Sequence, residues 1–158
     1  MSADKVREYL KSKNLEDHIQ VHEGTIDTVE HAALQVGCSE AEIAKTLSFL
    51  VDDKPVIIVM AGDARVNNGK FKAFFHTKAR MIPRDRVKEL TGFEPGGVCP
   101  FGVKEGTPIY LDESMKRFEL VHPAAGDEYT SAAFTLEELE LASGATGWCN
   151  VCKGWGDS

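Results

Sequence analysis

The chain has 158 residues, of which 42% are hydrophobic and 27% charged, and this composition fits one globular domain with its own core. It excludes a disordered chain, and no apolar run approaches the ~18 residues of a membrane span. The charged, helix-patterned start, "MSADKVREYLKSK", differs from a signal peptide. The four cysteines are too few for a disulfide framework, so we expect reduced thiols in a cytoplasmic protein.

The net charge of −7 excludes a protein coated in basic surface, and we expect no DNA or membrane partner. The charge is unevenly distributed, because residues 65–88 hold eight of the 18 basic residues and a single acid, Asp85. The segment predicts a local site for a polyanion. A solvated face whose cations pair with acids elsewhere is the alternative. The eight residues are Arg65, Lys70, Lys72, Lys78, Arg80, Arg84, Arg86 and Lys88.

Hydrophobic periodicity and turn residues predict the elements in chain order. Helices are expected over residues 2–13, 28–36, 67–76, 83–91 and 135–143, with a short one from Ser39. Strands are expected over residues 18–23, 45–52, 55–62, 79–82, 107–113, 117–122 and 129–134. Adjacent hairpins and intervening helices favour an α+β domain with a mixed or antiparallel sheet. The glycine-rich residues 144–158 are expected to form a loosely ordered tail.

Lys45 opens the apolar run "TLSFLV". A lysine at the mouth of a buried strand loses hydration and needs a partner, although such a lysine more commonly extends to solvent. The next run ends at Gly62 and Asp63, where loops beyond strand ends commonly bind ligands. The same residues also make an ordinary turn.

The stretch "GGVCPFG", from Gly96 to Gly102, is the most unusual segment. Glycine lets a backbone approach a ligand and direct N–H groups at a phosphate or an oxyanion. Cys99 is a candidate nucleophile, which would need a nearby base or a lowered pKa. A plain connecting loop is the third interpretation.

Two further features carry weaker signals. The "CNVC" of Cys149 to Cys152 has the spacing of half a zinc site, and no second pair completes it, so we expect no metal and no cofactor. His122 ends a predicted strand before a proline, where it either faces a ligand or fills a turn.

Four segments together resemble the YbaK/EbsC-like aminoacyl-tRNA deacylases, relatives of the editing domain of bacterial prolyl-tRNA synthetases. They are "TVEHAALQVGCSEAEIAKTLSFL", "VIIVMAGDARVNNGKF", "MIPRDRVKELTGFEPGGVCPFG" and "PIYLDESM". The combination of "IAKTL", "GDARV" and "GGVCPFG" in this order carries the resemblance. It implies one editing-type domain over residues 1–158, built on a curved mixed β-sheet, partly barrel-like, flanked by helices.

The resemblance also implies site residues for the 3′ end of an aminoacyl-tRNA. Lys45 matches the key lysine, and Gly96, Gly97 and Pro100 match the G-x-x-x-P loop that faces the substrate carbonyl. Thr46 is expected beside the lysine in the same pocket, with Gly62, Asp63, Cys99 and His122 as further substrate contacts. Cys99 stands where relatives often have serine. Arg65, Lys70, Lys72, Arg84 and Arg86 are expected to contact the tRNA backbone.

The predicted activity is therefore a metal-independent, trans-acting deacylase for a mischarged tRNA, expected to be a prolyl tRNA carrying Cys or Ala, with prolyl-tRNA synthetase as a partner. A catalytically silent module that binds tRNA or a nucleotide, or docks on a synthetase, is the first alternative. A thiol hydrolase that uses Cys99 is the second.

Overall fold

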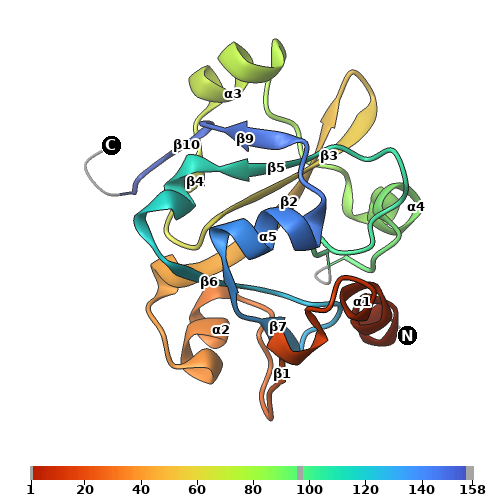
Figure 1. The fold of residues 1–158 in the computed structure, drawn as a ribbon. Helices are drawn as coiled ribbons and strands as arrows, with labels where there is room; N and C mark the ends of the chain where they lie inside the picture. The colour runs from red at the N-terminus through yellow and green to blue at the C-terminus, as the bar shows by residue number, and fades with distance from the viewer. Residues whose placement is uncertain (1, 96–97, 156–158) are drawn as a thin grey trace.

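A mixed six-stranded sheet forms the centre of the protein (Figure 1). The computed structural model describes residues 2–95 and 98–155. The strand order is β8-β6-β2-β3-β5-β9, and the curved sheet with flanking helices confirms the predicted α+β class. The strands are β2 (Ile43–Val51), β3 (Lys54–Ala61), β5 (Ile109–Asp112), β6 (Leu120–Pro123), β8 (Phe134–Thr135) and β9 (Gly147–Cys149).

The antiparallel hairpin of β2 and β3 is the longest pairing in the sheet, and it confirms the two predicted apolar strands. Its register runs from Ala44 opposite Ala61 to Val51 opposite Lys54. Asp52 and Asp53 make the turn with positive φ angles, which aspartate tolerates better than most residues. Strand β3 is buried from Val56 to Ala61, as expected for a strand in the middle of a sheet.

Five α-helices surround the sheet in the described part of the chain: α1 (Ser2–Lys11), α2 (Val29–Val36), α3 (Asn68–Phe75), α4 (Val87–Thr91) and α5 (Leu136–Ser143). Side chains of Thr28, Asn67 and Thr135 cap α2, α3 and α5 by accepting a backbone N–H. In Figure 1, α3 lies above the sheet and α2 below it. Short 3₁₀ turns occupy Glu16–His18, Glu40–Glu42, Arg84–Arg86 and Glu113–Arg117.

The segment expected to be a loose tail is instead part of the fold as far as residue 155. Strand β9 pairs in parallel with β5, and β10 (Cys152–Lys153) pairs with β4 (Arg65–Val66). Cys149, Val151 and Cys152 are buried. The glycine-rich composition concealed these contacts because the apolar residues that dock the segment are few and irregularly spaced.

The remaining pairings are small. Strands β1 (Ile19–Val21) and β7 (Thr130–Ala132) form a separate two-stranded antiparallel sheet. The strand expected over residues 79–82 is reduced to one bridge, between Phe49 and Met81. That reduction matters for the candidate site, because the segment covers only part of the edge of β2.

Candidate functional site

The edge of β2 that faces away from β3 has a gap in its pairing. Strand β6 pairs with β2 only at Ile43 and Ala44. Pairing resumes where the Leu50 N–H donates to Arg80 and the Ser48 carbonyl accepts from the Ile82 N–H. Peptide groups of alternate residues point to the same edge, so the N–H and carbonyl of Thr46 face the gap. The gap gives a ligand access to strand backbone.

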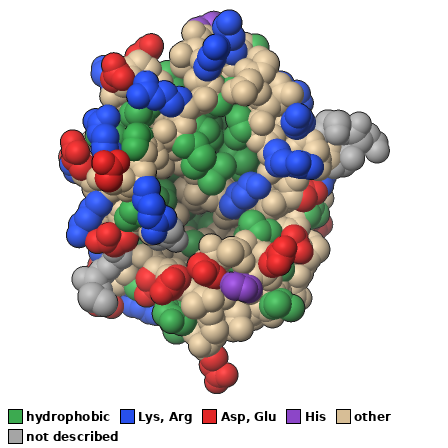
Figure 2. Space-filling model, turned by 180° about the vertical axis from the view of Figure 1, so that it is seen from behind, with side chains coloured by type: hydrophobic (Ala, Val, Ile, Leu, Met, Phe, Trp, Pro, Cys, Tyr) green, Lys and Arg blue, Asp and Glu red, His purple; other side chains and the backbone are tan. Residues whose placement is uncertain are grey.

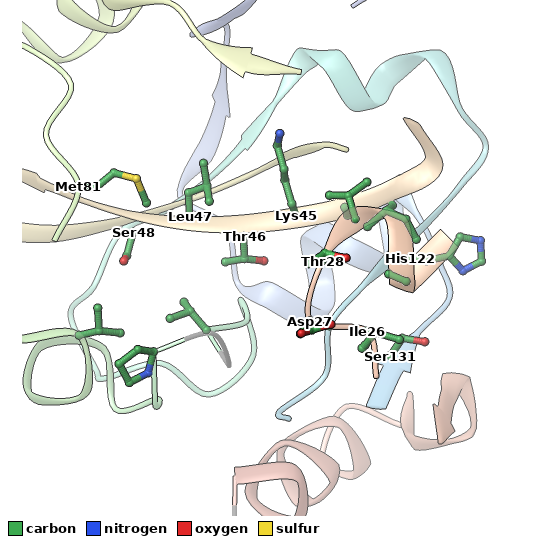
Figure 3. Close-up of a pocket in the computed structure, with 18 of the residues that line it drawn as sticks. Ile26, Asp27, Thr28, Lys45, Thr46, Leu47, Ser48, Met81, His122 and Ser131 are labelled. Carbon is green, nitrogen blue, oxygen red and sulfur yellow. The ribbon is translucent and has the colours of Figure 1, made fainter. Parts of the chain in front are cut away.

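A cavity of about 480 Å³ lies beside this gap (Figure 3). One wall is β2, another is the start of α2, and a third comes from segment 81–87 together with Pro95 and Val98. Its described polar and charged lining side chains are Asp27, Thr28, Lys45, Thr46, Ser48, Arg84, His122 and Ser131. A mostly apolar hollow with a few polar groups is the usual form of a small-molecule site.

Two buried polar atoms at this cavity have no hydrogen-bond partner: Oγ1 of Thr46 and Nδ1 of His122. Most buried polar side-chain atoms in proteins are paired, so each unpaired one requires an explanation. Both residues line the same cavity, so a molecule that enters it can supply the missing partners. No other buried side-chain oxygen or nitrogen in the described residues lacks a partner.

Lys45 and Thr46 both line the cavity, as expected, but their side chains leave opposite faces of β2. Figure 3 shows the lysine leaving the strand on one side, whereas Thr46 and Ser48 leave on the other. The ammonium donates to the carbonyls of Ala64, at 2.5 Å, and Gly62, at 3.3 Å. Burial lowers the pKa of Lys45, partly opposed by the nearby Cys152 and Asp63. The lysine is thus held by carbonyl dipoles, and within residues 2–95 and 98–155 it has no ion-pair partner at contact distance.

A second, shallower hollow of about 350 Å³ adjoins the first on the lysine's side of β2. The two hollows share Lys45, Leu47 and Met81. The second also touches Arg65 and Asn68, at the start of the basic segment. The candidate site therefore straddles the open edge of β2, with an enclosed part and a part that leads toward basic residues.

Gly62 and Asp63 support the lysine from the end of β3. A Cβ on Gly62 would lie 2.0 Å from the Glu40 carbonyl oxygen, so only glycine fits this close approach. The Asp63 carboxylate pairs with both terminal nitrogens of Arg117, at 2.6 and 3.0 Å, and this contact lowers its pKa. Asp63 is therefore engaged within the protein, and Gly62 contributes its carbonyl to Lys45.

The structure describes only part of the glycine loop, Gly96 to Gly102. Gly96 and Gly97 lie outside the described residues, while Pro95 and Val98 on either side line the cavity. Cys99 and Pro100 are buried, and neither is among the described residues that line the cavity. Burial raises the pKa of Cys99 to about 12, and its thiol points at the Phe101 carbonyl. The structure contradicts the interpretation of Cys99 as a nucleophile or as a side chain at the pocket rim, since an exposed thiolate is required for reaction.

His122 lies at the end of the cavity nearest β7. It belongs to the part of β6 that pairs in parallel with β2. Burial lowers its pKa, with Glu42 acting in the opposite direction. A second histidine, His22, contacts the Ser131 hydroxyl at 2.7 Å. Ser131 lines the cavity, so sequence positions 22, 122 and 131 meet there although no spacing rule connects them.

The predicted tRNA-contacting residues differ in their exposure and in their contacts within the protein. Arg65, Lys72, Arg84 and Arg86 are exposed, and Arg84 lines the cavity. Lys70 is half-buried and donates to the Cys152 carbonyl at 2.9 Å, so it also holds the C-terminal segment. Figure 2 shows Lys and Arg side chains above and beside an apolar hollow and mainly Asp and Glu beneath it. The field across this face favours a polyanion that approaches from the side of α3.

Neither a metal centre nor a membrane helix is evident in residues 2–95 and 98–155. No three or more His, Cys, Asp or Glu side chains in those ranges are arranged to hold a metal ion. Cys149 and Cys152 are buried thiols beside Asp112, and none of the helices there is long and apolar enough to cross a bilayer.

Comparison with known proteins identifies the family of this domain. The profile of the "Aminoacyl-tRNA editing domain" matches residues 23–141, a range that includes the open edge of β2, the lysine and the cavity. The chain belongs to the aminoacyl-tRNA editing domain family. This editing domain is of the YbaK-like type, as the sequence resemblance predicted.

Several relatives resemble this editing domain over different lengths. The "Uncharacterized protein YwhH" of Bacillus subtilis (strain 168) is 42% identical over 98% of this chain and 99% of its own. The proline–tRNA ligase of the same organism is 29% identical over 68% of this chain, but the match spans only 19% of the ligase. A crystal structure described as a proposed trans-editing enzyme for prolyl tRNA synthetase superimposes with a TM-score of 0.86, at 28% identity and with 97% and 98% of the two chains covered.

Sequence reasoning missed several residues that the structure places at or behind the site. Asp27 and Ser131 line the cavity, Arg117 holds Asp63, and Asp112 anchors the C-terminal segment. Asp27 was hidden because it directly precedes the helix cap Thr28, where an acid is unremarkable. The others depend on pairings between distant strands, which no local pattern reports.

Proposed function

We propose that this editing domain acts in trans as a deacylase and hydrolyses the ester of a prolyl tRNA mischarged with alanine or cysteine. Family membership supports deacylase chemistry on an aminoacyl-tRNA. The observation that carries the proposal is the small cavity at the open edge of β2, with the unpartnered Thr46 hydroxyl and Lys45 on opposite faces of that strand. Prolyl-tRNA synthetase is the proposed partner, because several prolyl-tRNA ligases share this domain, and the proposed location is the cytoplasm.

The two hollows suggest how the substrate lies. The amino acid enters the enclosed cavity, whose size and apolar walls limit which side chains fit, as in sieve editing. The terminal adenosine crosses the open edge toward Lys45 and the second hollow. From there the tRNA backbone follows the exposed Arg65, Lys72, Arg84 and Arg86.

Hydrolysis in this arrangement needs a positioned water and a place for the oxyanion. Water attacks the ester carbonyl carbon, the carbon–oxygen bond to the ribose breaks, and the ribose hydroxyl leaves with a proton from the attacking water. Backbone N–H groups at Gly96 and Gly97 are the proposed donors to the oxyanion, and Lys45 fixes the adenosine end. The proposal includes metal independence, so protein treated with a chelator should retain its activity.

The test is a deacylation panel with alanyl, cysteinyl, seryl and prolyl forms of the prolyl tRNA. Wild-type protein is expected to hydrolyse alanyl or cysteinyl ester and to spare the prolyl ester. Lys45→Ala should lower kcat/KM about 100-fold, because it removes the cation that carbonyls hold where the two hollows meet. Thermal unfolding should show that the variant remains folded.

Lys54→Ala is the matched control, since Lys54 is exposed at the hairpin turn at the far end of β2 and β3, and its activity should match the wild type. Full activity of Lys45→Ala would disprove the assigned site. Binding of the charged tRNAs without hydrolysis of any would favour the silent binding module.

A further inference from the structure

The cavity contains one carboxylate among its described lining residues, and it belongs to Asp27. Lys45 and Arg84, the cations of that lining, lie on other elements. An acid is unexpected in a site for tRNA, because a phosphate would be repelled by it. A carboxylate in the lining of this cavity is suited to a cationic group in the ligand, beside its existing contact with His31.

The Asp27 side chain is fixed in place. Its Oδ1 lies 2.7 Å from Nδ1 of His31, one helical turn away, and the preceding Thr25 also donates to it. Those hydrogen bonds, the one from His31 being the larger cause, lower the pKa of Asp27. The next residue, Thr28, caps α2 by accepting from the His31 N–H, so the backbone on both sides of Asp27 is tied to the start of the helix.

The Asp27 carboxylate can accept further hydrogen bonds beyond these two, because an ionised carboxylate accepts at about four lone-pair positions. Figure 3 shows Asp27 below Thr46, with its carboxylate directed to the cavity. The Thr46 hydroxyl is the unpartnered buried acceptor described above. Two acceptors thus face the same space from different walls, one of them charged.

An aminoacyl ester carries a matching group. Its α-ammonium has three donors and sits one carbon away from the carbonyl that water attacks. Anchoring it would fix the carbonyl relative to the glycine loop whatever side chain the amino acid has. On the basis of the proposed function, we propose that Asp27 is the anionic acceptor for the α-ammonium of the substrate, with the Thr46 hydroxyl as a second acceptor.

This subsite discriminates by charge and not by side-chain size. It favours esters with a free α-ammonium over esters in which that group is blocked or replaced, such as peptidyl or α-hydroxyacyl esters. The cavity then selects among amino acids by volume. The two selections are separable, and this separation makes the assignment testable.

The experiment compares alanyl and lactyl esters of the same prolyl tRNA, which differ by an ammonium replaced with a hydroxyl. Wild type, Asp27→Asn and the control Asp53→Asn are assayed on both esters. Asp53 lies in the β2–β3 turn, away from the cavity, and asparagine tolerates its positive φ. Asp27→Asn is expected to lower kcat/KM for the alanyl ester about 10- to 100-fold, the range of a lost charge-assisted hydrogen bond, and to leave the lactyl ester nearly unchanged.

The ratio of the two esters within one protein is insensitive to partial loss of folding. An equal loss on both esters in Asp27→Asn would show a structural role and overturn the inference, as would unchanged rates on both. In either case the wild type would still deacylate, so the proposed function would stand. A wild type inactive on every ester would overturn the proposed hydrolysis, and the same comparison made with dissociation constants would then decide whether Asp27 binds the ammonium.

Discussion

Two buried polar clusters in this protein differ in how fully their hydrogen bonds are made. At the C-terminal segment, the Asp112 carboxylate is fully buried and accepts from the N–H groups of Val151 and Ser114, each at 2.9 Å. The Cys149 thiol lies 3.8 Å from the same carboxylate. At the cavity, by contrast, the Thr46 hydroxyl and His122 Nδ1 have no partner.

The difference separates structural polar groups from functional ones. A buried carboxylate with its hydrogen bonds made holds β5, β9 and the strand after it together. A buried polar atom without a hydrogen bond reduces stability, and such atoms are retained where a ligand uses them. The number of hydrogen bonds made, more than residue type, therefore distinguishes the anchor from the site.

The largest expected effect is on stability, at the Asp112 cluster, whose hydrogen bonds are made. Asp112→Ala would leave two buried N–H groups without an acceptor, and we expect the free energy of unfolding to fall by about 3–5 kcal/mol. Chemical denaturation measures this change. Asp85→Ala, at an exposed site, is the control and should change stability by less than about 0.5 kcal/mol. A loss at Asp112 as small as in the control would contradict the anchoring role.

At the cavity, substitution should leave stability intact and lower activity. Thr46→Val removes a hydroxyl that has no partner in the free protein, so stability should stay the same or rise by up to about 1 kcal/mol. Deacylation should still fall about 10-fold in kcat/KM, the effect of one lost hydrogen bond to the substrate. A parallel loss of stability and activity would mean that Thr46 is structural.

The smallest effect on activity is expected at Cys99. This residue is fully buried with a raised pKa, so Cys99→Ala should change kcat/KM by less than about 2-fold, while the lost volume costs about 1 kcal/mol of stability. Assays before and after iodoacetamide provide a second readout, and the thiol should resist alkylation in the folded protein. Loss of activity in Cys99→Ala without unfolding would restore the nucleophile hypothesis.

Apolar runs and capping residues predicted the elements whose formation depends on neighbouring residues in the sequence. The apolar runs gave β2 and β3, and the capping residues Thr28 and Thr135 gave the starts of α2 and α5. Of the two interpretations left open for Lys45, the structure supports a lysine held by partners, because two carbonyls accept from its ammonium. The resemblance placed Lys45 and Thr46 in one pocket, which both of them line, and the alternation of side chains along a strand implies that they point to opposite faces.

Features that depend on distant pairing could not be predicted. The C-terminal segment docks because Asp112, 37 residues before Cys149, accepts its hydrogen bonds. Cys99 is fully buried although Val98 before it is only half-buried, and the glycine-rich composition does not specify this difference. Asp27 joins the site only because the start of α2 lies across the cavity from the open edge of β2.

The gap in β2 has a consequence for how the protein behaves in a crowded solution. Unpaired strand edges recruit other chains and lead to aggregation, and proteins usually protect them. Here β6 closes one side of the gap and the segment from Arg80 to Ile82 closes the other, so three residues, about 10 Å of strand, stay open. An incoming β-strand finds too few backbone groups to pair with, whereas the proposed aminoacyl ester needs only a short stretch of open strand.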